Sequence, residues 1–437
     1  MIKRSHYTNE LEKAVGKSVV VAGWTHDVRV LGNINFILLR DSGGIAQITA
    51  AKDKVPKDVL EICKKLHQED VIVVEGKVVE NKKAPRGIEI IPSKIDLLNK
   101  AQTPLPLDPT EKVPANLDTR LDWRSIDLRK PKNLATFKIQ AKIIEGFETY
   151  LRKNGFVQVY TPSIIGGTSE SGSEVFPVVY YNKEAFLRQD PQLHRELLIA
   201  GGFEKIFDAG PSWRAEKSHT VRHLSEHRTI APELAFIKDE HDVIEVEQEM
   251  VVFGLKFVQA ECAAELELLK KEVAIPKKIP ILEFPKIYDI LEGLGKKTQF
   301  GEEYDKESEM LLGEHVKEKF KCDFFFVNRF PFAAKPFYVM RIDEEPQWAR
   351  SVDLIFKGVE MSSGGQREHR YEKIIAQMKE KKMKVDSLKW FTEVFRYGVP
   401  PMGGYSIGIE RFTQQLLDIP NVRETTLFPR DPERLLP

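Results

Sequence analysis

Short runs of alternating apolar and polar residues fill the first hundred positions of the chain. Five such runs begin at Ser18 and end near Asn99, and a helical stretch lies between the third and the fourth. The segment Asp41–Gly44, DSGG, has the composition of a hairpin turn between the second and third runs. Five strands with one helix in this place predict an OB-fold β-barrel over residues 1–100.

Proline interrupts this pattern after residue 100. Four prolines follow at short intervals, namely Pro104, Pro106, Pro109 and Pro114. Each proline removes a backbone donor and restricts the residue before it, so regular helix and strand are disfavoured here. Residues 101–134 are therefore predicted to form an extended hinge or linker between two domains.

A long amphipathic helix is predicted after the linker. Its apolar residues recur every four positions, at Ile139, Ile143, Phe147 and Leu151. This spacing gives one apolar stripe, and Gly155 ends the helix. Strand-like runs then alternate with helices, at residues 157–162, 205–210, 230–237, 323–328, 337–342 and 351–363. Helices around a mainly antiparallel sheet predict that residues 135–437 form an α+β domain, so the chain is an α+β multidomain protein.

Composition and charge exclude several classes of protein. The 437 residues are 42% hydrophobic and 30% charged, which is typical of soluble globular proteins. No apolar run suits a membrane span and no signal core stands at the N-terminus, so we expect a cytoplasmic protein with no membrane partner. Cys63, Cys262 and Cys322 are widely spaced, which predicts core positions and neither disulfides nor a zinc site.

The distribution of charge is a weaker signal. Lysines and arginines number 66, as do aspartates and glutamates, but residues 1–100 hold 17 of the former and 13 of the latter. The small positive surplus favours nucleic acid as the partner of the barrel, although a barrel without a ligand has the same pattern.

Three segments of the second domain resemble the signature motifs of class II aminoacyl-tRNA synthetases. The first is the long helix and its strand, which ends in Thr161-Pro162, and the second is residues 210–236, GPSWRAEKSHTVRHLSEHRTIAPELAF. The third is residues 403–412, GGYSIGIERF. The resemblance implies an ATP-using catalytic domain on an antiparallel sheet flanked by helices. It also implies a homodimer, because the first motif forms the dimer interface in that family.

The second and third motifs supply the implied catalytic residues, Arg214, Glu216 and Arg411. Attack of a carboxylate on the α-phosphate brings two anions together, and the planar guanidinium of Arg214 suits a bridge between them. Arg411 would meet the γ-phosphate of ATP. The implied ATP-binding set is Arg214, Ala215, Glu216, Arg222, His223, Leu224, Glu360, Gly408, Ile409, Glu410 and Arg411. His227 is a candidate for stacking on the adenine.

A Mg²⁺ site is expected between these motifs, in residues 351–370, SVDLIFKGVEMSSGGQREHR. Asp353 and Glu360 stand seven residues apart, and Mg²⁺ is commonly held by one or two carboxylates together with phosphate oxygens. The segment resembles a stretch specific to the same family, which adds Ser363 to the implied metal ligands. A polar hairpin without an ion would have the same local pattern.

The whole chain is most similar to the aspartyl-tRNA synthetases of the archaeal and eukaryotic type. That resemblance implies L-aspartate as substrate and tRNA-Asp as partner. The implied aspartate-binding residues are Glu170, Gln192, Arg195, Arg214, Ser363 and Arg367.

Three positions depart from the aspartate pattern. Asp190 replaces a serine, Arg195 replaces the lysine that pairs with the substrate side chain, and Ala231 replaces the aspartate behind that lysine. Asparaginyl-tRNA synthetases also lack this lysine, so an asparaginyl enzyme is the alternative. Two guanidiniums, Arg195 and Arg367, suit a carboxylate better than a neutral amide, which favours aspartate.

The resemblance also assigns anticodon-reading residues to the barrel: His26, Arg29, Phe36, Gln47 and Pro85. An aromatic ring and edge hydrogen bonds are the means by which OB folds read splayed bases. Phe36 suits the barrel core equally well. His26 and Pro85 match the pair found in enzymes that accept both tRNA-Asp and tRNA-Asn, so a non-discriminating enzyme is expected.

A paralogue that has kept the ATP site but no longer charges tRNA is a further alternative. The barrel argues against it, since synthetase-derived biosynthetic paralogues often lack that domain. A protein that only binds RNA would leave Arg214, Glu360 and Arg411 without a role.

Overall fold

The computed structural model describes residues 3–166, 174–215 and 220–436. The chain divides into two compact units, residues 1–134 and 135–437. Each unit has its own hydrophobic core, and the two are described separately below.

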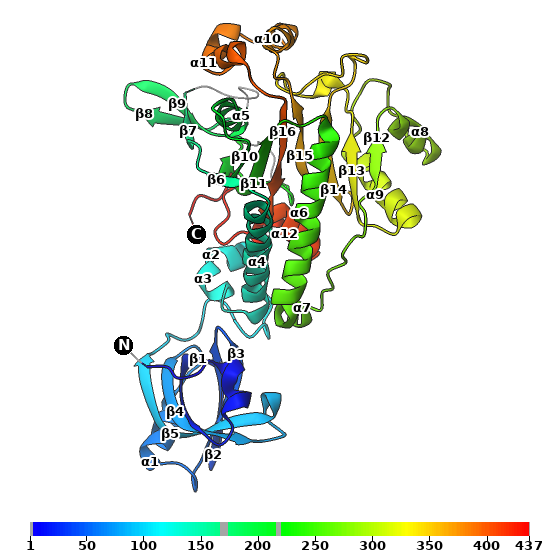
Figure 1. Ribbon diagram of the computed structural model, residues 1–437. Helices are drawn as coiled ribbons and strands as arrows, with labels where there is room; N and C mark the ends of the chain where they lie inside the picture. The colour runs from blue at the N-terminus through cyan, green and yellow to red at the C-terminus, as the bar shows by residue number, and fades with distance from the viewer. Residues whose placement is uncertain (1–2, 167–173, 216–219, 437) are drawn as a thin grey trace. The chain divides into compact units, whose positions relative to one another are not determined.

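Five strands of the first unit close into a barrel in the order β1-β2-β3-β5-β4 (Figure 1). Their bounds are β1 Ser18–Leu31, β2 Ile34–Asp41, β3 Gly44–Ala51, β4 Val71–Glu80 and β5 Ile88–Asn99. Helix α1 (Lys57–Lys65) lies between β3 and β4, and Asp41 pairs with Gly44 across the predicted hairpin turn. Alternate residues such as Val21, Ile37 and Ile48 fill the interior, so the predicted OB fold is confirmed.

The segment between barrel and sheet is only partly extended. Residues 100–116 lack regular structure, as the prolines predict, but α2 (Leu117–Asp122) and α3 (Arg124–Asp127) follow. Asn116 caps α2, because its side-chain oxygen accepts a hydrogen bond from the Thr119 N–H at 2.8 Å. The expectation of a wholly extended linker is therefore wrong after residue 116.

An eight-stranded sheet organises the second unit, in the order β12-β13-β14-β15-β16-β11-β10-β6. The bounds are β6 Val157–Val159, β10 Lys205–Trp213, β11 Glu226–Ala235, β12 Ile281–Glu283, β13 Phe324–Asn328, β14 Ser351–Phe356, β15 Val359–Arg367 and β16 Met402–Gly408. Neighbours run antiparallel except at the two edges, where β6 pairs with β10 and β12 pairs with β13 in parallel. The mainly antiparallel sheet confirms the predicted fold class.

Two long helices, α4 (Pro131–Lys153) and α6 (Glu240–Glu261), run side by side along the sheet (Figure 1). They approach closely where Gly146 meets Gly254; a Cβ on Gly146 would lie 3.1 Å from the Gly254 Cα. The predicted stripe of α4 is buried, with Ile139 and Phe147 wholly inaccessible to solvent. The other helices are α5 Gln192–Ala200, α7 Ala263–Leu269, α8 Lys286–Gly293, α9 Lys306–Phe320, α10 Tyr371–Glu380, α11 Lys389–Thr392 and α12 Ile409–Leu416.

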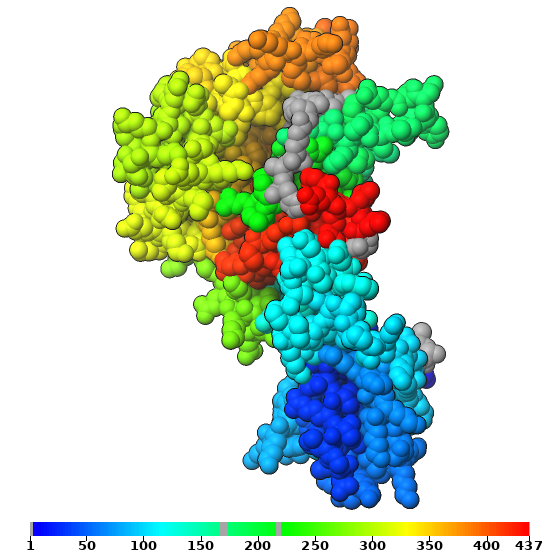
Figure 2. Space-filling view, turned by 180° about the vertical axis from the view of Figure 1, so that it is seen from behind, coloured from blue at the N-terminus to red at the C-terminus, as the bar shows by residue number. Residues whose placement is uncertain are grey.

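Smaller features complete the second unit. A three-stranded sheet of β7 (Ile164–Ile165), β9 (Lys183–Leu187) and β8 (Pro177–Tyr180) projects from its surface, in green in Figure 2. The strand predicted at residues 337–342 is wrong, because this apolar segment makes only isolated bridges, at Val339 and Arg341. The three cysteines are free and buried, as predicted. Among the described residues, no helix has the length and apolar character needed to cross a bilayer.

Candidate functional site

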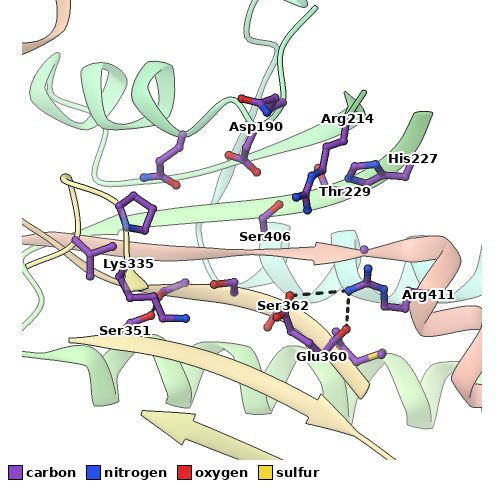
Figure 3. Close-up of a pocket in the computed structure, with 18 of the residues that line it drawn as sticks. Asp190, Arg214, His227, Thr229, Lys335, Ser351, Glu360, Ser362, Ser406 and Arg411 are labelled. Carbon is purple, nitrogen blue, oxygen red and sulfur yellow. Dashed lines mark hydrogen bonds and ion pairs between the residues drawn. The ribbon is translucent and has the colours of Figure 1, made fainter. Parts of the chain in front are cut away.

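A cavity of about 430 Å³ opens on one face of the sheet, between β11, β15 and β16 and the segment before α5 (Figure 3). Its walls bring together residues that lie far apart in the sequence. The expected site residues that line it are Gln192, Arg195, Arg214, Arg222, His223, Leu224, Glu360, Ser363, Arg367, Gly408, Glu410 and Arg411.

At one end of the cavity, two buried arginines share one carboxylate. Arg195 Nε lies 3.3 Å from Glu233 Oε2, and Arg367 Nε donates to Glu233 Oε1 at 2.8 Å. Both guanidiniums also donate to Gln192 Oε1, at 2.5 and 2.8 Å. Burial works against both cations, but Asp190 and Glu233 outweigh it and raise the pKa of Arg195, and Glu233 does the same for Arg367. We call these residues, with Asp190, the amino-acid end.

The three departures from the aspartate pattern form part of this network. Ala231 is buried, and Glu233, two residues later on the same face of β11, pairs with Arg195. Asp190 Oδ1 lies 3.1 Å from Arg195 Nη1. Two carboxylates, Asp190 and Glu233, therefore already oppose the two guanidiniums.

Glu196 fixes the orientation of Gln192 at the amino-acid end. Gln192 Nε2 donates to Glu196 Oε1 at 2.8 Å, which orients the amide so that its oxygen meets the arginines. Glu196 is completely buried, and burial raises its pKa to about 8, so it is mostly uncharged at neutral pH.

Glycine in β16 makes room for the shared carboxylate. A Cβ on Gly404 would lie 2.6 Å from Glu233 Oε2 and 2.2 Å from the Pro232 carbonyl oxygen. The Gly404 carbonyl accepts a hydrogen bond from Arg367 at 2.9 Å. Gly404 thus makes room for Glu233, whereas Gly408 alone of the motif's three glycines lines the cavity.

The other end of the cavity, which we call the nucleotide end, is more open. Arg214 is 48% exposed and pairs with Glu174 at 3.1 Å. Arg411 donates to the Glu360 carbonyl at 3.0 Å, and its guanidinium lies 3.9 Å from the Glu360 carboxylate (Figure 3). Several cations therefore face a space that a polyanion could fill.

His227 lies beside these arginines (Figure 3). Burial and then the nearby charges of Arg411 and Arg214 lower its pKa to about 4. The imidazole is therefore neutral at physiological pH, which suits contact with an uncharged aromatic base.

A cluster of carboxylates lies beside the nucleotide end. The pKa of Glu360 is raised by its enclosure and then by Asp353. Lys335 Nζ lies 3.0 Å from Asp353 Oδ2 and 3.4 Å from Glu303 Oε1. Asp353 Oδ1 is buried without a hydrogen-bond partner. Neighbouring carboxylates with an unused oxygen fit the ligand preference of Mg²⁺, with Ser363 opposite Asp353 in the β14–β15 ladder.

Some expected residues do not line the cavity. Ile409 is a core residue, and Ala215 lies outside the cavity wall. Asp353 does not line the cavity itself but contacts Lys335, which does. Glu170 and Glu216 fall outside the described residues.

Sequence reasoning missed Glu196, Glu233 and Lys335. Glu196 stands one helical turn after Gln192 on the buried face of α5, and a carboxylate on such a face was an available signal.

Three of the expected anticodon residues lie together on the outer face of the barrel. Arg29 pairs with Phe36 between β1 and β2, and Gln47 lies on the same face of β3. Phe36 is half-buried, whereas Ile37 beside it is wholly buried in the core, so the alternative of a core position for Phe36 is wrong. Glu89, which the sequence did not reveal, accepts from Gln47 at 3.1 Å.

The remaining two expected positions, His26 and Pro85, lie in irregular parts of the barrel. His26 sits in a bulge of β1 and contacts Arg40 at 2.9 Å, and burial followed by that charge lowers its pKa. Pro85 is exposed in a short turn between β4 and β5.

Comparison with known proteins bears on both units. Residues 116–432 match the family of tRNA synthetases class II (D, K and N), and residues 19–98 match the OB-fold nucleic acid binding domain. The aspartate–tRNA(Asp) ligase of Pyrococcus furiosus is 45% identical over 99% of this chain and 100% of its own length. The aspartate–tRNA(Asp/Asn) ligase of Methanopyrus kandleri is 42% identical over the full length of both chains.

A solved structure has a similar fold. Asparaginyl-tRNA synthetase from Pyrococcus horikoshii, complexed with asparaginyl-adenylate, matches with a TM-score of 0.93 at 31% identity, and all of both chains is covered. The protein thus belongs to the class II tRNA synthetases (D, K and N).

Proposed function

We propose that this enzyme uses ATP to activate L-aspartate and attaches it to tRNA-Asp and to tRNA-Asn. The observation that carries the proposal is the pair of buried guanidiniums, Arg195 and Arg367, at the end of a cavity whose other end holds Arg214 and Arg411. The similarity to ligases named for aspartate supports it.

The proposed reaction needs no protein nucleophile. The α-carboxylate of the amino acid attacks the α-phosphorus of ATP, an aspartyl-adenylate forms, and pyrophosphate leaves. Arg214 bridges the two reacting anions, Arg411 holds the γ-phosphate, and the neutral His227 ring lies against the adenine. Catalysis then consists of orientation and charge neutralisation in a fixed site.

Asp353, Glu360 and Ser363 would hold Mg²⁺ in this scheme. When bound, the ion would offset the charge of the phosphates. Lys335 already offsets part of the carboxylate charge from the protein side.

An asparaginyl enzyme is the second candidate, and one observation favours it. Asp190 and Glu233 already balance the charges of Arg195 and Arg367, so the amino-acid end is not a simple cationic pocket. The structural match to an asparaginyl enzyme agrees with this alternative.

Pyrophosphate exchange distinguishes the candidates. Purified protein with ATP and Mg²⁺ should exchange pyrophosphate with L-aspartate and much more slowly with L-asparagine. Exchange with asparagine alone would overturn the aspartate assignment, and activation without charging of any tRNA would indicate a repurposed paralogue.

The barrel is proposed to read the anticodon through Phe36, Arg29 and Gln47. Charging of two transcripts that differ only in the third anticodon base tests His26 and Pro85. Similar rates are expected for the two transcripts. A strong preference for tRNA-Asp would contradict the proposal that the enzyme is non-discriminating.

We further propose a homodimer formed along β6, an edge strand of the sheet. Two apolar side chains are exposed there and just after it, Val157 at 50% and Tyr160 at 81%. Sedimentation of the wild type should give twice the chain mass, and Tyr160→Asp should shift the protein toward monomer.

A further inference from the structure

Asp190 is the accessible member of a buried ion pair. The Arg195 side chain is 1% exposed and the Asp190 side chain 20%, and both line the cavity. Nε and Nη2 of Arg195 are engaged by Glu233 and Gln192, so Asp190 takes the remaining nitrogen, Nη1.

The contact between the two side chains is loose despite its short distance. Arg195 Nη1 and Asp190 Oδ1 are buried and 3.1 Å apart, yet neither makes a hydrogen bond of acceptable angle. A charge contact without aligned donor and acceptor is a weak one, and a ligand with better geometry can replace it.

Charge balance shows which ligand can do so. Arg195 and Arg367 face Asp190 and Glu233, and the raised pKa of Glu196 keeps that third acid mostly neutral. A dicarboxylate alone would add unbalanced negative charge to this end. A substrate that also brings an ammonium group can separate the pair and give each member a new partner.

The position of Asp190 suits that ammonium. Figure 3 shows its carboxylate on the same side of the cavity as the Arg214 guanidinium. In an α-amino acid, the ammonium stands on the carbon between the α-carboxylate and the side chain. Arg214 and Arg195 are the proposed partners of those two groups. Asp190 contacts Arg195 directly, and it lines the same cavity as Arg214.

We propose that Asp190 binds the α-ammonium of the substrate and that the Asp190–Arg195 pair opens on binding, which releases Arg195 to the substrate side chain. Each member of the pair thus stands in for one charged group of the substrate. The inference rests on the proposed function for the identity of the amino acid, but the role of Asp190 toward an ammonium holds for aspartate and asparagine alike.

Calorimetric titration of the full-length protein tests the proposal with two ligand pairs. L-Aspartate is compared with succinate, and L-asparagine with succinamate, because the second member of each pair lacks only the ammonium. The variants are Asp190→Asn and Asp190→Glu. Asp343→Asn is the matched control, since it removes a carboxylate from an exposed arginine pair elsewhere in the same unit.

Asp190→Asn should weaken the amino acid by about tenfold or more and leave its deaminated analogue unchanged or tighter, because Arg195 is freed. Asp190→Glu should restore part of the preference, and Asp343→Asn should change neither ligand. Equal weakening of both ligands would overturn the proposal in favour of a structural role. Equal tightening of both ligands would also overturn the proposal, because it would mean that Asp190 only keeps ligands away from Arg195.

The result also separates this inference from the proposed function. If only the asparagine pair binds and shows the expected change, Asp190 has the proposed role and the aspartate assignment fails. If aspartate binds but its preference over succinate is the same in wild type and Asp190→Asn, the aspartate assignment stands and the role of Asp190 fails. If none of the four compounds binds, both fail.

Discussion

The two ends of the cavity are built from the same residue types but hold their charges differently. At the amino-acid end, Arg195, Arg367 and Glu233 are at most 4% exposed, and both arginines lie within 3.3 Å of Glu233. At the nucleotide end, Arg214 is 48% and Arg411 27% exposed, and Arg411 lies 3.9 Å from its carboxylate.

This difference indicates two ways of preparing a site. The amino-acid end is complete before a ligand arrives, so a substrate must replace a partner that is already there. At the nucleotide end the arginines also have protein partners, but they are more exposed, so a ligand can add to these contacts or replace them. Loss of a charge at the first end should therefore cost stability as well as binding, whereas loss at the second should cost activity alone.

The largest effect is expected from Arg367→Ala. The change leaves Glu233 buried with only the longer contacts to Arg195 and Gln192 among the described residues, and loss of one partner of a buried pair costs about 3–5 kcal/mol. Calorimetry of thermal unfolding should show a large decrease in the midpoint of the catalytic unit, together with loss of amino-acid activation. Arg396→Ala is the control, since its pair with Glu393 is exposed and should cost at most about 1 kcal/mol. Similar midpoints for the two variants would contradict a preformed amino-acid end.

Arg214→Ala should affect catalysis alone. Loss of a donor to the developing charge lowers the rate by about 10²–10³-fold, and the half-exposed side chain contributes little to stability. Pyrophosphate exchange and the unfolding midpoint should be measured on one preparation. Arg214→Lys keeps the charge but loses the planar fork, so it should recover little activity. A midpoint lowered as far as in Arg367→Ala would remove the distinction between the two ends.

Glu196→Gln should change how stability depends on pH. The folded-state pKa of Glu196 is about 8 against an ordinary 4.5, so its contribution is complete below pH 4.5 and is lost as pH rises toward 8. The glutamine cannot ionise. As the pH rises from 5.5 to 8, the free energy of unfolding of the variant should therefore increase by about 3 kcal/mol relative to that of the wild type. Unfolding midpoints across this range check the prediction. A constant difference between the two proteins would mean that Glu196 is charged in the folded protein.

The elements of both units follow largely from local patterns in the sequence. Alternation over residues 18–99 predicts the barrel, and the stripe from Ile139 to Leu151 predicts α4. Residues 337–342 fail because an apolar run indicates burial and does not show whether a partner strand is available. The prolines correctly exclude regular structure up to Pro114, but the Asn116 cap then begins a helix.

The chemistry of the site is predictable only in part, because its partners are distant in sequence. Motif resemblance places Arg195 and Arg367 near the substrate. Glu233 lies 38 positions after Arg195 and 134 before Arg367, and no periodicity reveals such contacts. Asp190 is conspicuous in the sequence, but its role follows only from its contact with Arg195.

Lys335→Met is expected to have the smallest effect. It tests a residue that does not follow the difference between the two ends of the cavity. Lys335 is a cation beside the nucleotide end that is only 10% exposed and has contacts with Asp353 and Glu303. Without its ammonium, the carboxylates should attract a divalent cation more strongly, and Mn²⁺ should bind the ATP-free protein about tenfold more tightly. Electron paramagnetic resonance of free Mn²⁺ measures this directly, with Lys286→Met as an exposed control. Unchanged or weaker Mn²⁺ binding would mean that Lys335 does not compete with a metal ion for these carboxylates.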